Sequence, residues 1–131
     1  MDPKSLVDKI LHSNKHIRFV AVCNMDGKII SSANNENVTN LLSQEETEKT
    51  LQRAVNSWKS RDELSDKTGK GEYVLAVYEK LKRITMPIDS KHLAYVTFER
   101  DGSNQDITDS ISFWRPADAA HGLSYEETVA P

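Results

Sequence analysis

The stretch from Ile17 to Ser32 constrains this chain most, because it joins two apolar segments through a tight turn. Its first half, Phe19–Cys23, is a continuous run of apolar residues, which is typical of a strand covered on both faces. Asp26 and Gly27 are residue types that adopt positive φ in hairpin turns. We therefore predict a β-hairpin whose first strand lies inside a sheet.

Two registers of this hairpin are compatible with the sequence. A two-residue loop pairs Met25 with Lys28, whereas a three-residue loop with Gly27 in the left-handed conformation pairs Asn24 with Lys28. The registers differ by one residue, so they exchange the faces of the two isoleucines that follow. The sequence leaves both registers open.

Helical and strand patterns alternate along the rest of the chain. Apolar stripes with a period near 3.6 predict a helix from Pro3 to about Asn14 and a longer one over residues 43–63, where Ser43 and Glu46 have capping-box spacing. Further strands are predicted at 73–78, 84–88 and 93–98, followed by a short helix that opens at Asp106. The element order is α-β-β-α-β-β-β-α, which indicates an α/β (α+β) fold.

Finer expectations follow from the same patterns. Residues 73–78 are apolar throughout and should be covered on both faces, whereas the alternation in 84–88 predicts one buried face. Residues 66–71 should form a turn, and the long helix should bury Leu64 near its end. In the last helix Trp114 should face the core.

Composition limits the classes of protein that remain. With 131 residues, 37% of them hydrophobic, the chain suits one domain over 1–116 and a C-terminal tail over 117–131. The net charge of -3 argues against general nucleic-acid binding. No apolar run approaches the roughly 20 residues of a membrane span, and we expect no membrane partner. A single cysteine cannot form an internal disulfide, so we expect a cytoplasmic protein.

No catalytic signature can be assembled from the reactive residues. Cys23 lies in an apolar strand without a cation nearby in sequence and is interpreted as a buried thiol. His12 and His16 have the spacing of a metal-binding pair, but the helix ends between them and no third ligand is specified. The basic cluster at 80–83 is interpreted as a solvated strand connection rather than a contact for an acidic partner. We expect no enzyme, metal or cofactor.

The element order and the hairpin segment RFVAVCNMDGKIISSA resemble the roadblock domain of dynein light chains and its prokaryotic relatives. More widely, they are similar to the profilin-like group, and the resemblance covers about residues 4–114. It implies a five-stranded antiparallel sheet with the long helix on one face and the two outer helices on the other. It also implies a non-catalytic homodimer that serves as a scaffold or as a regulator of small GTPases.

The resemblance implies where such a dimer would form, because family members pair the third strand and the long helix. An apolar edge strand invites aggregation unless it is covered or paired, and a two-fold dimer would pair it. For Trp58, which continues the apolar stripe of the long helix, the core is favoured over the interface. The candidate interface residues are Tyr73, Leu75, Val77, Tyr78 and Trp58.

The hairpin phrase is also similar to sensory PAS and Cache domains, in which a sheet and helices enclose a small molecule. This alternative requires a large apolar pocket against the sheet. The single long helix between the second and third strands argues against it, since a PAS domain usually has several short helices there. The identity of a protein partner stays open at this stage.

Overall fold

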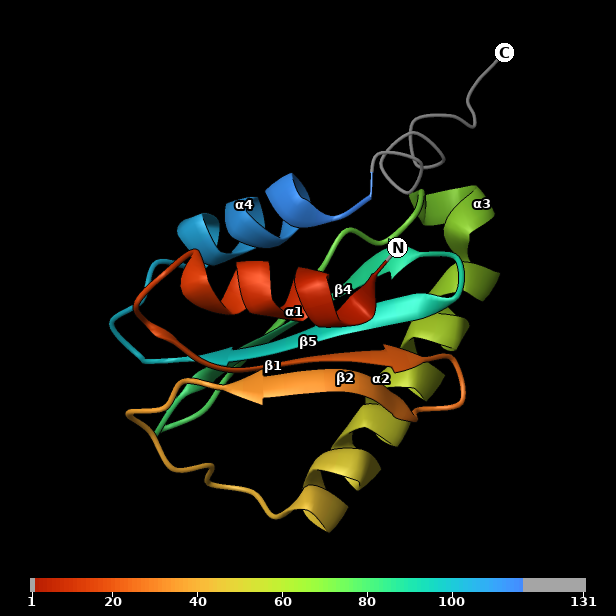
Figure 1. The fold of residues 1–131 in the computed structure, drawn as a ribbon. Coiled ribbons are helices and arrows are strands. Elements are labelled where there is room, and N and C mark those ends of the chain that lie inside the picture. Colours follow the sequence, from red (N-terminus) through yellow and green to blue (C-terminus); the bar gives the residue numbers. More distant parts are fainter. Residues whose placement is uncertain (1, 117–131) are drawn as a thin grey trace.

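The computed structural model describes residues 2–116 and shows a five-stranded sheet between two layers of helices (Figure 1). The predicted tail, 117–131, lies outside the described residues. Within them, no helix is both long and apolar enough to cross a membrane. The elements are α1 Pro3–His12, β1 Ile17–Asn24, β2 Ile29–Asn34, α2 Gln44–Glu63, α3 Ser65–Thr68, β3 Val74–Val77, β4 Lys82–Asp89, β5 His92–Phe98 and α4 Asn104–Trp114.

The sheet is antiparallel with the strand order β2-β1-β5-β4-β3, so β1 and β5 form its centre. Figure 1 shows α1 and α4 together over one face and α2 over the other. The predicted fold class, with helices on both faces, is therefore confirmed. Nearly every residue of β1 and β5 is buried, as expected for strands covered on both sides.

Two hydrophobic cores lie on opposite faces of the sheet. They separate because successive side chains of a strand point to opposite faces. The larger core receives residues from α1 and α4, and the smaller one receives residues from α2. The larger core includes Leu6, Val7, Ile10, Ile17, Val20, Ile84, Met86, Val96, Phe98, Ile107 and Ile111; the smaller includes Phe19, Ala21, Cys23, Leu51, Val55, Trp58, Leu93 and Tyr95.

The β1–β2 hairpin adopts the three-residue register. Asn24 pairs with Lys28 through a 3.0 Å backbone hydrogen bond, and Gly27 has φ of 80°. The Asn24 side chain accepts hydrogen bonds from the backbone N–H groups of Asp26 and Lys28, which closes the loop. Next to the loop, β2 contains a bulge, because Val22 pairs with Ser31 and Cys23 pairs with Ile29. Ile30 is the extra residue and is 44% exposed.

Helix boundaries follow their caps. Ser43 and Glu46 form the predicted capping box, and α2 begins at Gln44. In α4 the Ser103 hydroxyl caps the helix, so it opens earlier than the predicted Asp106. Residues 65–68 form the one-turn helix α3 in place of part of the predicted turn, ending at Gly69 with φ of 82°.

Several burial predictions are wrong. β3 is the edge strand, so its side chains are half-buried or exposed instead of covered on both faces. Thr85 in β4 is buried because α2 covers it, although the alternation predicted an exposed face. Leu64 is 57% exposed, since α2 ends just before it. Trp114 is 37% exposed and lies at the surface beside Lys9 of α1.

The hairpin glycine gives a test of how the β1–β2 turn meets α2. A Cβ on Gly27 would lie 2.8 Å from the Gln52 Oε1 and 3.1 Å from its backbone Cα, whereas a Cβ on Gly69 would meet nothing. Both glycines have positive φ, which costs alanine about 1–3 kcal/mol. We expect G27A to lower the free energy of unfolding by roughly 1 kcal/mol more than G69A, because of the added overlap. Urea denaturation measures both; equal losses would contradict the close packing at Gln52.

Candidate functional site

The sequence-predicted interface residues divide into buried and exposed members. Trp58 is 3% exposed, and its indole Nε1 donates a 3.0 Å hydrogen bond to the Thr85 hydroxyl, so it belongs to the α2-side core as favoured. Leu75 is partly buried against the opposite core. Tyr73, Val77 and Tyr78 are 46%, 55% and 47% exposed along the β3 edge. The exposed candidate surface is therefore β3 and its ends.

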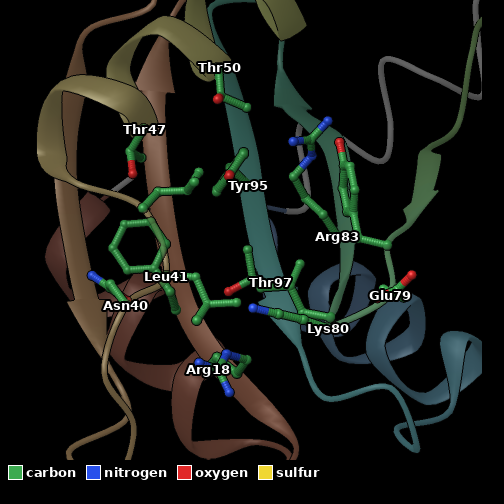
Figure 2. Close-up of a pocket in the computed structure, with 14 residues that line it drawn as sticks. Arg18, Asn40, Leu41, Thr47, Thr50, Glu79, Lys80, Arg83, Tyr95 and Thr97 are labelled. Atoms are coloured by element: carbon green, nitrogen blue, oxygen red, sulfur yellow. The ribbon is translucent and has the colours of Figure 1, made fainter.

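A second candidate site is a pocket of about 580 Å³ on the α2 side of the sheet. Figure 2 shows Asn40 and Leu41 on one side of it, Lys80 and Arg83 on the other, and Tyr95 and Thr97 between them. The volume is that of a small-molecule site. The pocket is also the feature that a ligand-sensing domain requires.

The pocket floor is a row of residues across three neighbouring strands. Phe19 of β1 pairs with Thr97 of β5, which pairs with Arg83 of β4. Thr47 and Thr50 of α2 line one wall of the pocket. Their side chains are short, so they do not cover the residues of the pocket floor. The turn between β3 and β4, which includes Lys80 and Leu81, forms the opposite wall.

A bulge in β1 directs Arg18 into the pocket. The β1–β5 register shifts between Ile17 and Phe19, which leaves Arg18 as the extra residue. Bulges re-aim side chains in this way, and Arg18 lines the same pocket as its neighbour Phe19. Its guanidinium pairs with the Glu99 carboxylate and donates a 2.9 Å hydrogen bond to the Thr39 carbonyl. The charge of Arg18 is thus compensated within the protein.

Arg83 and Lys80 differ from Arg18 in this respect. Within residues 2–116 no carboxylate lies within ion-pair distance of either side chain. The Arg83 guanidinium lies over two aromatic rings instead, 5.4 Å from the centroid of Tyr78 and 5.5 Å from that of Tyr95. Lys80 of the basic cluster at 80–83 is exposed, as a solvated connection predicts, and both Lys80 and Arg83 line the pocket.

Two buried groups of the α2-side core have shifted pKa values. Burial raises the pKa of the Cys23 thiol to about 11, so the thiol is protonated at neutral pH. Burial also raises the pKa of Tyr95, and the adjacent Arg83 opposes this effect. Tyr95 therefore offers the pocket a neutral phenol.

The histidine pair does not share a ligand. His12 Nδ1 lies 2.8 Å from the Asp8 carbonyl within α1, whereas His16 lies beyond the end of α1 and its Nε2 is 3.8 Å from Asp101. Over residues 2–116 no three His, Cys, Asp or Glu side chains are grouped as metal ligands would be. His92, the first residue of β5, forms a 2.9 Å contact with Asp89 of β4.

Sequence reasoning missed the pocket because its residues are far apart in the chain. Leu41 and Leu42 precede α2 and are 51% and 39% exposed, although an apolar pair beside a helix suggests burial. The cluster at 80–83 was the other signal. Only the tertiary structure brings these two segments together across β1 and β5.

Comparison with solved structures shows the roadblock/profilin-like fold. A Roadblock/LC7 domain from Streptomyces avermitilis matches with a TM-score of 0.69 at 11% identity, covering 87% of this chain and 92% of that one. The gliding protein MglB from Thermus thermophilus matches with a TM-score of 0.72 at 8% identity, covering 94% and 88%. Schizosaccharomyces pombe profilin matches with a TM-score of 0.63 at 11% identity, covering 95% and 100%.

Sequence comparison alone does not reach these proteins. No protein-family model matches the chain, and a search of curated proteins finds no match. At identities of 8–11% the likeness concerns the fold, so the roadblock-like resemblance read from the element order is confirmed at that level.

The buried Trp58–Thr85 hydrogen bond gives a test of the core assignment. T85V removes the acceptor and leaves the indole N–H unpaired, so we expect a loss of about 1–3 kcal/mol in the free energy of unfolding. In a W58F background the same replacement should cost about 1 kcal/mol less, because no donor remains. Thermal or urea unfolding of the wild type, T85V, W58F and the double variant measures the coupling energy between Trp58 and Thr85. Additive losses would show that the hydrogen bond contributes nothing.

Proposed function

We propose that this chain is a non-catalytic, homodimeric regulatory module of roadblock type, which pairs through the exposed edge of β3. The observation that carries this proposal is the chemistry of that edge. β3 lies at the end of the sheet, and Tyr73, Val77 and Tyr78 are all about half exposed along it. An edge of this kind presents unpaired backbone groups beside apolar side chains, which favours pairing with another strand.

The opposite edge of the sheet offers a contrast. The exposed residues of β2 are Ile30, Ser32 and Asn34, so this edge has one large apolar side chain and two polar ones. A partner strand would cover less apolar surface at the β2 edge than at the β3 edge. The two edges therefore differ in side-chain chemistry, which supports β3 as the pairing edge.

A groove beside β3 supports the participation of α2. It has a volume of about 310 Å³ and lies between α2 and the β3–β4 end of the sheet. Arg53, Ser57 and Arg61 of α2 line one side, and Val74 and Ala76 of β3 line the other. A helix from a second copy, brought close by β3 pairing, would cover this groove. A two-fold dimer is the commonest closed assembly.

The proposed role is regulation of a small GTPase or scaffolding of a signalling complex in the cytoplasm. The roadblock-like fold supports this role, because regulation and scaffolding are what the family resemblance implies. The partner proposed is a protein; neither nucleic acid nor a membrane is proposed as a partner, given the net charge of -3.

The dimer is tested by a charge on each edge of the sheet. V77K places a cation on the β3 edge, where two copies would meet, and S32K places one on the β2 edge. Both positions are exposed, but Lys82 lies opposite Val77 in the β3–β4 pair, so we expect V77K to lower the free energy of unfolding by up to about 1 kcal/mol and S32K by less than about 0.5 kcal/mol. By light scattering at high micromolar concentration we expect dimers for the wild type and S32K and monomers for V77K. A monomeric wild type, or equal effects of both variants, would contradict β3 pairing.

The partner class is tested by affinity capture from the native cell with the purified wild-type dimer, followed by mass spectrometry. We expect enrichment of a protein with a phosphate-binding loop, and the S32K variant used as bait should capture the same protein. Absence of any such protein among the enriched ones would overturn the GTPase role without affecting the dimer.

A further inference from the structure

The pocket between residues 40–42 and 78–83 combines two properties that the proposed dimer does not explain. One side carries cations without carboxylate partners among the described residues, and the other side carries exposed leucines. We propose that this pocket binds an amphipathic organic anion, a carboxylate on a medium-length aliphatic chain. The pocket and the proposed β3 interface share Tyr78, and the other candidate interface residues lie outside the pocket lining.

Arg83 is the centre of the proposed head-group site. It is half-buried, and its contacts with the rings of Tyr78 and Tyr95 restrict its guanidinium before any ligand arrives, at the boundary between this pocket and the groove beside β3. A cation removed from water is stabilised only in part by aromatic faces and gains most from a paired anion. Within residues 2–116 no carboxylate or backbone carbonyl accepts a hydrogen bond from the Arg83 guanidinium. A carboxylate would bind its planar donors in a bidentate arrangement.

The surrounding charges favour an anion over a neutral or cationic head group. Lys80 lines the same wall as Arg83 and has no carboxylate within ion-pair distance among the described residues. The lining carries three cationic side chains, of Arg18, Lys80 and Arg83, against one acidic side chain, Glu79, and Glu99 outside the lining pairs with Arg18; Lys80 and Glu79 are both exposed. The pocket therefore has a net positive character. Thr97 adds a hydroxyl in the floor between these groups (Figure 2).

The apolar body of the ligand is indicated by the opposite wall. Leu41 and Leu42 are 51% and 39% exposed and line the pocket together with Leu81 and Phe19. Exposed leucines gathered around a concave surface gain free energy when an apolar group covers them. Three of these four side chains are aliphatic, which favours an alkyl chain. A volume of about 580 Å³ accommodates a chain of medium length.

The test compares three probes of one chain length: octanoate, 1-octanol and octylammonium. Isothermal titration calorimetry should show saturable binding of octanoate. We expect octanol to bind at least about tenfold more weakly, because it lacks the charge-assisted hydrogen bonds, and octylammonium not to bind. Equal affinity for the three probes, or no binding of octanoate at millimolar concentration, would overturn the proposal.

Matched variants separate the head-group contacts from general electrostatics. K80Q/R83Q should weaken octanoate at least about tenfold, while K59Q, which removes an exposed lysine of α2 outside the pocket, should leave binding unchanged. L41S/L42S should weaken octanoate and octanol alike, since both lose the apolar wall. Equal effects of K80Q/R83Q and K59Q would contradict the site.

Two controls keep folding and dimerisation apart from binding. If R83Q lowers the melting temperature, R83K serves as a second variant, because it retains the positive charge. R83K should bind octanoate more tightly than R83Q. V77K should bind octanoate as the wild type does, so a failed dimer and a failed pocket give different results. Binding of an acidic, leucine-containing peptide in the absence of octanoate binding would assign the pocket to a protein ligand and overturn the small-anion proposal.

Discussion

Burial of the two central strands on both faces is the constraint on which the rest of this structure depends. β1 and β5 alternate their apolar side chains between two cores, and neither face can be left to water. One layer of helices would cover only half of this surface. The chain therefore places α1 and α4 on one face and α2 on the other (Figure 1).

The same arrangement creates both candidate surfaces. α2 is a single helix and covers its face of a five-stranded sheet incompletely. It is anchored by Leu51, Val55 and Trp58, and the row formed by Phe19, Thr97 and Arg83 remains open as a pocket floor. The β3 end of the sheet is open in the same way, and there the groove and the exposed edge meet. Tyr78 lies at the junction, since it lines both hollows and follows β3 directly.

Local signals predicted much of the fold, because they act over short distances. The apolar run Phe19–Cys23, the capping box of Ser43 and Glu46, and the hairpin glycine each act on their own segment, and each appears in the structure as predicted. The errors fall where burial depends on a distant element. Thr85 is buried because Trp58 reaches it from α2, and Trp114 lies at the surface at the end of α4, where the Lys9 ammonium of α1 is its neighbour.

The sequence by itself determined the fold class, the element order apart from the one-turn helix α3, and the apolar character of the segment at 73–78. It did not determine that this segment is an edge strand, because strand order depends on which apolar faces the helices cover. The hairpin register was likewise decided by Asn24 and by the contact of Gly27 with α2. The pocket was decided only in three dimensions, where a β1 bulge, two leucines and an arginine from separate segments meet. The charged and apolar side chains of the pocket come from segments far apart in the chain and meet only after folding. A pocket of this kind therefore has no local sequence signature.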